Sequence, residues 1–230
     1  MALIRSAISM VLAAGVLSAC GTLGADDPLR LAGSAIGAAI SRSEPSQLTA
    51  TRAGLLESGF DEPLLVASIR KPVEIKAGLL RVAQPQGISF WSGADGSTVK
   101  TDQGVLAGTV SVNYDLYSAQ TTGTLAALQG DRSTPYPRVY RHLNALNQLD
   151  LTRFFCQMSD PVPETIVVFD RQHQTLRFTE SCITERPGPT GVATEIENTY
   201  WKDPNRLFLW RSDQWMGEKS GYILLERVFE

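Results

Sequence analysis

The segment at positions 198–215, NTYWKDPNRLFLWRSDQW, combines residue types that can bind a sugar. Aromatic rings stack against the apolar face of a pyranose ring, while charged and amide side chains hydrogen-bond its hydroxyl groups. The alternative is that these tryptophans anchor the hydrophobic core where a sheet crosses itself. Under the binding interpretation, the candidate residues are Trp91, Trp201, Trp210, Arg211, Asp213, Gln214 and Trp215.

A β-hairpin is predicted inside this segment. Asp203-Pro204-Asn205-Arg206 suits a type I turn, because Asp favours its first position and Pro its second. A hairpin closed there pairs Lys202 with Leu207, Trp201 with Phe208 and Thr199 with Trp210. We therefore expect Trp201, Phe208 and Trp210 to share one face, with Tyr200, Leu207 and Leu209 on the other.

The sequence carries no recognised catalytic motif. GxSxG, HExxH, a phosphate loop and a GxGxxG after a strand are all absent. The only histidines, His142 and His173, lie on predicted strands. Glu195, Glu197, Asp203 and Asp213 surround the aromatic segment, but a glycosidase needs two carboxylates facing each other, which a sequence cannot test. We expect a protein that is not an enzyme, with no catalytic residue, no metal site and no cofactor other than a covalent lipid.

The expected lipid is carried by Cys20. Residues 1–19 have one cation, a short apolar run and small closing residues, as in a signal peptide. Leu17-Ser18-Ala19-Cys20 is typical of a bacterial lipobox, in which the cysteine carries diacylglycerol and an amine-linked acyl chain such as palmitate. The alternative is an ordinary signal peptide that ends at a chance cysteine. Each buried methylene contributes about 0.8 kcal/mol, so two or three chains hold a protein on a membrane.

Residues 20–45, rich in Gly, Ala and Ser, are then expected to be a lipidated tether. The residue after the cysteine is Gly21 rather than Asp, which favours the outer membrane, facing the periplasm.

The other two cysteines, Cys156 and Cys182, are expected to form a disulfide in an oxidising periplasm. Such a bridge stabilises by roughly 3–4 kcal/mol in the chain-entropy model. Two buried, unpaired thiols are the alternative, and a metal site is less favoured because the chain has so few histidines.

Composition limits the remaining partners. The 230-residue chain has a formal net charge of −3 and no basic run, so we expect no nucleic-acid binding. No second apolar stretch approaches the eighteen residues of a membrane span.

The pattern from position 63 onward predicts strands and turns. We expect an all-β fold, a mostly antiparallel sandwich or a partly open barrel, with one or two short N-terminal helices. Residues 46–57 are a predicted helix, 121–133 a short helix or loop, and 46–230 a single domain. Asp95-Gly96 predicts a hairpin between Trp91 and Val99. The predicted strand segments are 63–70, 75–83, 87–92, 97–101, 104–119, 139–146, 151–158, 164–170, 174–183, 194–201, 206–212 and 221–229.

The chain resembles the YjbF/GfcB family of capsule and exopolysaccharide lipoproteins. The resemblance rests on the lipobox, GISFWSGADGSTVKTDQGVL at 87–106, DLYSA at 115–119, the paired FFC and ESC, and ENTYWKDPNRLFLWRSDQWMG at 197–217. It covers residues 46–230. The sequence departs from the family pattern at 207–209, where a glycine-containing turn is usual.

The resemblance implies an all-β outer-membrane lipoprotein whose gene accompanies others for secreting or assembling surface polysaccharide. It supplies no catalytic residue. We expect the protein to assist polysaccharide export or assembly by binding glycan or proteins of the export machinery. The alternative is a lipid- or lipoprotein-handling module whose half-open barrel encloses an apolar cavity.

Overall fold

The computed structural model describes residues 52–57, 63–69, 75–112, 114–144, 146, 148–186 and 193–229. The predicted signal peptide, the tether and Cys20 lie outside these residues. Of the predicted helix 46–57, the described part is helical and forms α2 (Arg52–Glu57). Among the described residues, no helix has the length and apolar character that crossing a bilayer requires.

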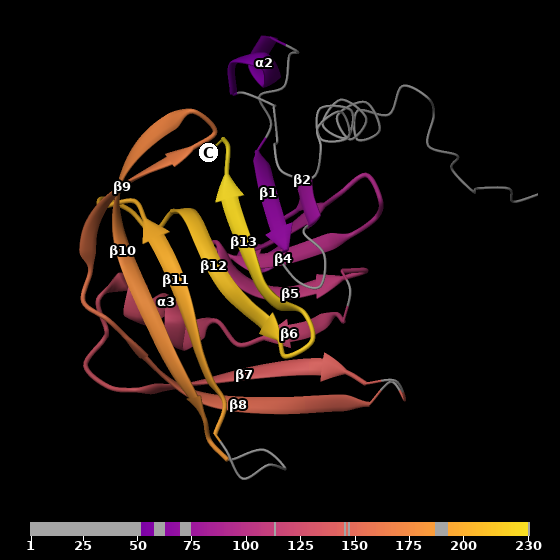
Figure 1. Ribbon diagram of the computed structural model, residues 1–230, viewed down its shortest axis with the longest axis vertical. Coiled ribbons are helices and arrows are strands. Elements are labelled where there is room, and N and C mark those ends of the chain that lie inside the picture. The colour runs from indigo at the N-terminus through magenta and orange to yellow at the C-terminus, as the bar shows by residue number, and fades with distance from the viewer. Residues whose placement is uncertain are drawn as a thin grey trace, which may run out of the picture.

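A single antiparallel sheet dominates the fold (Figure 1). Its ladder order is β5-β4-β3-β2-β1-β13-β12-β11-β10-β8-β7-β6, and β9 pairs with β10 off this path. The strands are β1 (Leu64–Ile69), β2 (Ile75–Ala83), β3 (Ile88–Ser92), β4 (Thr98–Asp102), β5 (Val105–Val110), β6 (Leu116–Ala119), β7 (Tyr136–Leu143), β8 (Leu149–Met158), β9 (Val162–Val168), β10 (Arg171–Thr184), β11 (Glu195–Lys202), β12 (Leu209–Gly217) and β13 (Gly221–Arg227).

The sheet curls until its two end strands, β5 and β6, lie side by side. The Leu116 N–H donates to Thr109 Oγ1 at 2.9 Å, and Lys100 Nζ donates to the Tyr117 carbonyl at 3.0 Å. Gly108 permits this approach, since a Cβ there would lie 3.0 Å from the Leu116 carbonyl oxygen. The fold is therefore a nearly closed barrel, which confirms the all-β prediction in its partly open barrel form.

The predicted strand segment 104–119 is wrong as one element. It divides into β5 and β6 because Ser111 and Tyr114 adopt positive φ angles of 58° and 57°. The Asp115 carboxylate stabilises the turn by accepting the N–H groups of Ser111 and Val112, each at 2.8 Å. An acidic side chain that bonds nearby backbone amides competes with strand pairing.

The Asp95-Gly96 hairpin is confirmed. Trp91 pairs with Val99 across β3 and β4, and Gly96 has a φ of 82°. The Asp95 carboxylate accepts the Ser97 N–H at 2.9 Å and its hydroxyl at 2.7 Å. The turn thus uses both the glycine's conformational freedom and an acidic cap.

The barrel interior is filled by side chains that alternate with exposed ones along each strand. Tyr140, Phe154 and Trp215 pack edge to face there, with ring centroids 5.0–5.7 Å apart. The helix α3 (Thr122–Gln129), inside the predicted segment 121–133, buries Ala127 and Leu128 against the same sheet. Core packing therefore leaves no continuous lumen through this part of the barrel.

The two cysteines lie directly opposite each other on β8 and β10. Cys156 and Cys182 form a disulfide there, with their Cα atoms 4.0 Å apart. The bridge joins the central residue pair of the stretch over which β8 and β10 are hydrogen-bonded.

One hairpin leaves the barrel wall. β9 and the first half of β10, residues 162–177, form an arm in which β9 pairs only with β10. Ile166 and Val168 on the arm pack against Trp210, with Trp201 and Phe208 beside them. The arm thus covers part of the outer face of β11 and β12.

The predicted register of the 198–215 hairpin is wrong, although its faces are correct. Lys202 pairs with Leu209, and Asp203 N–H donates to the Phe208 carbonyl at 2.8 Å. The loop is longer because Lys202 Nζ donates to two loop carbonyls, those of Asp203 and Arg206, and holds it open. A slip of two residues moves no side chain to the other face.

Beyond this loop, a bulge between Trp201 and Lys202 sets Trp201 opposite Arg211 and Thr199 opposite Asp213. Trp201, Phe208 and Trp210 share the outer cluster under the arm, and Tyr200, Leu207 and Leu209 share the inner one.

Candidate functional site

Trp91 has no surface on which a sugar could stack. Its side chain is 1% exposed, and the indole Nε1–H donates to Thr101 Oγ1 at 2.8 Å. The guanidinium of Arg227 lies 4.6 Å from the centre of its ring. The structure therefore places this candidate binding residue in the core.

Three of the candidate residues are engaged with the arm. Trp210 is buried beneath it, and the ring of His173 on the arm lies with its centroid 3.7 Å from that of Trp210. Arg211 donates to the Val167 carbonyl at 2.6 Å and forms an ion pair with Glu226. Its guanidinium also lies over the half-buried Trp201 ring. These side chains attach the arm to the barrel.

Gln214 is fully buried and connects strands across the interior. Its Oε1 accepts the Leu106 N–H at 2.9 Å, and its Nε2 donates to the Gly104 carbonyl at 3.1 Å. Asp213 is half-buried and pairs with Thr199 and Leu224 in the sheet. Neither residue lines the cavity that Trp215 reaches, so the predicted sugar-binding group does not assemble as one site.

Trp215 reaches a pocket at one end of the barrel, which we call the end pocket. This cavity of about 440 Å³ lies where the turn before β6, the β7–β8 hairpin and the β12–β13 turn meet. Its lining residues are Tyr114, Asp115, His142, Leu143, Asn144, Asp150, Thr152, Trp215, Gly217, Glu218, Lys219 and Ser220.

Aromatic and polar groups alternate around the end pocket. Trp215 is 5% exposed, whereas Tyr114 is 55% exposed. The ammonium of Lys219 lies 4.9 Å from the centre of the Tyr114 ring. His142 Nε2 donates to the Met216 carbonyl at 2.5 Å, because a carbonyl can only accept.

Gly217 lets the histidine come this close. A Cβ at that position would lie 2.8 Å from His142 Nε2, and the residue has a φ of 156°.

The carboxylates that line the pocket differ in how many hydrogen bonds they already accept. Asp115 accepts three hydrogen bonds that stabilise its own turn, from Thr109 Oγ1 and the N–H groups of Ser111 and Val112. Asp150 accepts a weaker bond from Asn144 Nδ2 at 3.3 Å. Asp115 is therefore a structural group, whereas Asp150 and Glu218 are exposed carboxylates on the rim.

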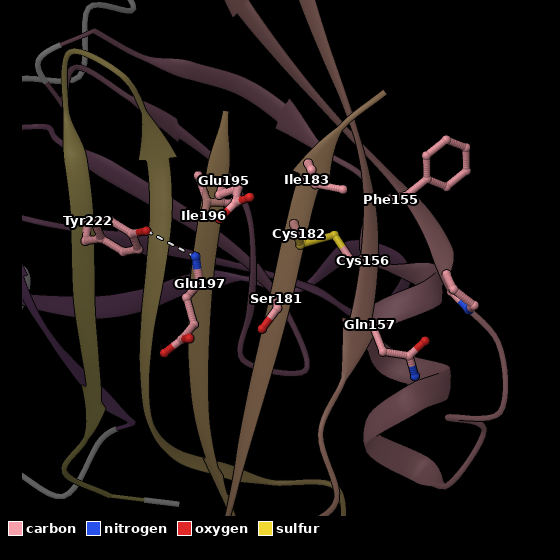
Figure 2. A pocket seen from close by; sticks show the side chains of 11 residues that line it. Phe155, Cys156, Gln157, Ser181, Cys182, Ile183, Glu195, Ile196, Glu197 and Tyr222 are labelled. Atoms are coloured by element: carbon pink, nitrogen blue, oxygen red, sulfur yellow. Dashed lines mark hydrogen bonds between the residues drawn. A yellow bond between two sulfur atoms is a disulfide. The ribbon is translucent and has the colours of Figure 1, made fainter. Parts of the chain in front are cut away.

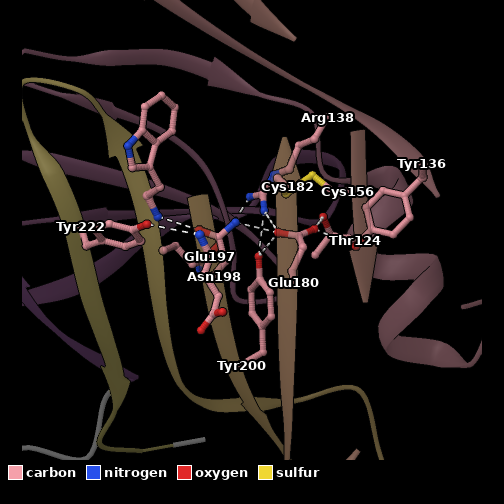
Figure 3. Close-up of a disulfide and its surroundings, with 12 residues drawn as sticks. Thr124, Tyr136, Arg138, Cys156, Glu180, Cys182, Glu197, Asn198, Tyr200 and Tyr222 are labelled. Atoms are coloured by element: carbon pink, nitrogen blue, oxygen red, sulfur yellow. Dashed lines mark hydrogen bonds and ion pairs between the residues drawn. A yellow bond between two sulfur atoms is a disulfide. The ribbon is translucent and has the colours of Figure 1, made fainter. Parts of the chain in front are cut away.

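The barrel interior contains a charged network that the sequence analysis missed (Figure 3). The Arg138 guanidinium and the Glu180 carboxylate form an ion pair with side chains only 1% and 0% exposed. Thr124, Tyr136, Asn198 and Tyr200 also donate to Glu180, at 2.6, 2.7, 2.7 and 3.0 Å. The sequence did offer a signal for this network, because two charged residues occupy inward strand positions. Arg138 precedes the inward Tyr140 by two residues, and Glu180 lies between the inward Phe178 and Cys182.

The network sets the protonation of its members. Burial by itself would raise the pKa of Glu180, but Arg138 and the hydrogen bonds from Thr124, Tyr136 and Asn198 hold the pKa of that carboxyl below its ordinary value. Burial, reinforced by Glu180, raises the pKa of the Tyr136 phenol. The interior therefore holds a charged Arg138–Glu180 pair at neutral pH.

Side chains next to this network connect β11 and β12 where the two strands are no longer paired. Past the Thr199–Asp213 pair, the Trp215 N–H donates to Asn198 Oδ1 at 2.7 Å, and the Glu197 N–H donates to the Tyr222 hydroxyl at 3.3 Å. Side chains thus replace the missing ladder bonds (Figure 3).

A shallow hollow of about 650 Å³ lies beside this separation, over the disulfide (Figure 2). Among the described residues, Cys156, Cys182 and Glu180 form one group whose ligand-type atoms lie within 4.8 Å of one another. The two sulfurs are bonded to each other, so they offer no thiolate for a metal ion.

Comparison with known proteins settles the family. A sequence model described as "group 4 capsule polysaccharide lipoprotein gfcB, YjbF" matches residues 59–228. The chain belongs to the YjbF family. The YjbF family is associated with capsule polysaccharide and consists of lipoproteins, which indicates a place in the cell envelope. None of the curated proteins matches the chain in sequence.

Two solved structures align with this YjbF-family chain. The hypothetical lipoprotein YmcC from Escherichia coli (K12) aligns with a TM-score of 0.65 and 18% identity over 78% of this chain and 93% of that chain. A structure described as an exported protein with a YmcC-like fold, from Bacteroides fragilis NCTC 9343, aligns with a TM-score of 0.39 and 10% identity over 74% of this chain and 94% of that chain. The first likeness supports the barrel architecture.

Proposed function

We propose that this protein is a non-enzymatic outer-membrane lipoprotein that assists the export or assembly of surface polysaccharide by binding glycan in the end pocket. It is anchored by the lipid on Cys20 and faces the periplasm. The family supports the link to capsule polysaccharide. The lining of the pocket supports the mode of action.

The observation that carries the proposal is the pairing of the Tyr114 and Trp215 side chains with a polar rim in one cavity of about 440 Å³. Sugar rings have an apolar C–H face and a hydroxyl edge, so they need both kinds of contact. A cavity of this size is within the range of small-molecule sites. Asn144, Thr152 and Lys219 supply the donors and acceptors that hydroxyl groups require.

Two features favour binding over catalysis. Asp115 is committed to its turn by three hydrogen bonds, so it is poorly placed to act as a nucleophile or general acid. His142 is held against the Met216 carbonyl through Nε2. The rim groups are suited to orienting a ligand.

The filled interior weighs against the lipid-handling alternative. That function needs an apolar cavity inside the barrel, whereas the interior holds the Arg138–Glu180 pair and its partners. Burying an acyl chain beside these groups would displace hydrogen bonds that they require.

The test is glycan binding by the purified lipoprotein in detergent. Oligosaccharides released from the host's own surface polysaccharide are titrated by calorimetry. Tyr114→Ala and Lys219→Ala are expected to weaken binding about tenfold each, because each removes a rim contact in a partly solvated site. Tyr117→Ala is the matched control, since Tyr117 is similarly exposed at 51% and does not line the pocket. Binding that is absent, or equally weakened by all three variants, would refute the glycan site.

A further inference from the structure

Exposed apolar side chains concentrate on one hairpin. Of thirteen large apolar side chains exposed among the described residues, five belong to β7, β8 and their connection. They are Leu143, Leu146, Leu149, Leu151 and Phe155, with exposures of 45%, 77%, 45%, 52% and 46%. A contiguous exposed patch of this kind marks a surface that meets another body.

The pairing of β7 with β8 places Leu143, Leu149, Leu151 and Phe155 on one face, and Leu146 lies in the turn that joins the two strands. Leu143 pairs with Leu149, and Arg141 pairs with Leu151. Their strand neighbours alternate with them, so Tyr140 and Phe154 point into the core. Phe155 projects from β8 away from the barrel (Figure 2). We call this outward surface the leucine–arginine face, made up of Arg141, Leu143, Leu146, Leu149, Leu151, Arg153 and Phe155.

Within the hairpin both charges on this face are positive, and the exposed Glu185 lies beside Arg153 just after β10. Arg141 is half-buried opposite Leu151, and Arg153 is exposed opposite Val139. Among the described outward residues of the hairpin there is no carboxylate, because Asp150 belongs to the opposite face and lines the end pocket. Leucines interleaved with arginines match the boundary between lipid headgroups and acyl chains.

We propose that the leucine–arginine face docks on a bilayer surface that contains anionic phospholipid. The leucines enter the headgroup boundary, and the two guanidinium groups pair with lipid phosphates. The lipid is joined to the barrel through the tether predicted at 20–45, so the covalent anchor alone does not set this orientation. The hairpin fixes which side of the barrel faces the membrane, and Leu143 brings the rim of the end pocket close to it.

The proposal goes beyond glycan binding and is tested by a probe that does not depend on it. The lipidated Leu146→Cys variant is labelled with an environment-sensitive fluorophore and reconstituted into vesicles of phosphatidylethanolamine and phosphatidylglycerol. The native cysteines form the disulfide and do not react. Brominated lipid is expected to quench the probe about threefold more strongly than a probe at Val82→Cys, where an apolar side chain is exposed to a similar extent, at 47%, on β2.

The charge contribution is measured separately. Replacing both arginines (Arg141→Gln with Arg153→Gln) in the Leu146→Cys background is expected to lower the quenching on phosphatidylglycerol vesicles to the level of neutral phosphatidylcholine vesicles. Equal quenching at positions 146 and 82 would overturn the proposal. A probe that is shielded from water but not quenched by brominated lipid would indicate that protein covers the face. Such shielding would come from a second copy if it needs high protein density, or from the chain's own N-terminal segment if it does not, and both outcomes also overturn the proposal.

Discussion

Glu180 illustrates how one residue organises the interior of the barrel. Its two carboxylate oxygens accept hydrogen bonds from five side chains on three other elements, α3, β7 and β11. A buried carboxylate is tolerated only when it is paired and fully bonded, because desolvation costs several kcal/mol per ion. Arg138 and its hydroxyl and amide neighbours meet that condition, so the network links α3, β7, β10 and β11.

Arg138→Met is expected to destabilise the fold by about 3–5 kcal/mol, because it leaves Glu180 as an uncompensated buried charge. Urea unfolding followed by tryptophan fluorescence measures the change. Arg177→Met is the matched control, since the Arg177–Glu164 pair is 36% and 39% exposed and such pairs contribute no more than about 1 kcal/mol. A loss no larger for Arg138→Met than for Arg177→Met would contradict the assigned role.

The lowered pKa of Glu180 predicts a specific acid sensitivity. A group whose folded pKa lies below its unfolded value stabilises the fold above the unfolded pKa and loses that contribution as the pH falls through the folded pKa. The ordinary value is 4.5, so this contribution should disappear progressively below about that pH.

The measurement is the free energy of unfolding from pH 6 down to pH 3. Glu180→Gln should lower stability at pH 6 and flatten the slope below pH 4.5, because one fewer proton is taken up on unfolding. Parallel curves for the two proteins would show that Glu180 is not the titrating group.

At the scale of elements, the arm explains the aromatic segment. Because β9 pairs only with β10, its position depends on the packing of Ile166 and Val168 against Trp210. The Arg211 bond to the Val167 carbonyl adds a polar attachment. Trp201 and Trp210, which were candidate sugar-stacking residues, form the surface on which the arm packs.

Trp210→Ala is therefore expected to release the arm while leaving the barrel folded. Removing a buried tryptophan destabilises the folded contacts by about 3–5 kcal/mol. Here most of the lost contacts are those between the arm and the barrel. Hydrogen exchange should show lost protection at residues 162–168 and unchanged protection in β1 and β13.

Val167→Ala is the control for this experiment, because Val167 lies on the same strand but is 51% exposed. It should leave the arm protected. Uniform loss of protection across the barrel in Trp210→Ala would contradict a separable arm.

At the scale of the whole molecule, the barrel holds two surfaces on opposite faces of one hairpin. The inward side of β7 and β8 supplies His142, Asp150 and Thr152 to the end pocket, and the outward side carries the exposed leucines. A rigid sheet fixes the position of the end pocket relative to the leucine–arginine face. A protein held at the membrane by that face would therefore keep the end pocket at a constant distance from the bilayer.

Anchoring itself makes a prediction about the complete chain. Cys20→Ala should move the protein from the membrane fraction to the soluble periplasmic fraction, since two or three acyl chains are lost. Cell fractionation with immunoblotting measures the distribution. Ser18→Ala, which keeps a small residue before the cysteine, should remain in the membrane. Persistence of Cys20→Ala in the detergent-extracted fraction would count against lipidation.

Local patterns were sufficient for the fold class and for most elements. The alternation of apolar and polar residues located the strands, and Asp95-Gly96 specified its hairpin because a short turn is controlled by its own residues. The faces of the 198–215 hairpin were also predicted, since the slip at Lys202 is two residues and the bulge beyond it leaves Trp201, Phe208 and Trp210 in one cluster.

Long-range packing decided the rest. The register at Lys202, the docking of the arm on Trp210 and the meeting of Arg138 with Glu180 each join segments whose contact no local rule predicts. The end pocket arises in the same way, because three turns far apart in the chain come together only when the sheet curls. The sequence by itself determined a β-rich chain with a lipobox and a pair of cysteines, since these depend on neighbouring residues. Only the tertiary structure decided which tryptophans are core and which reach a surface, because burial depends on what the rest of the chain places over them.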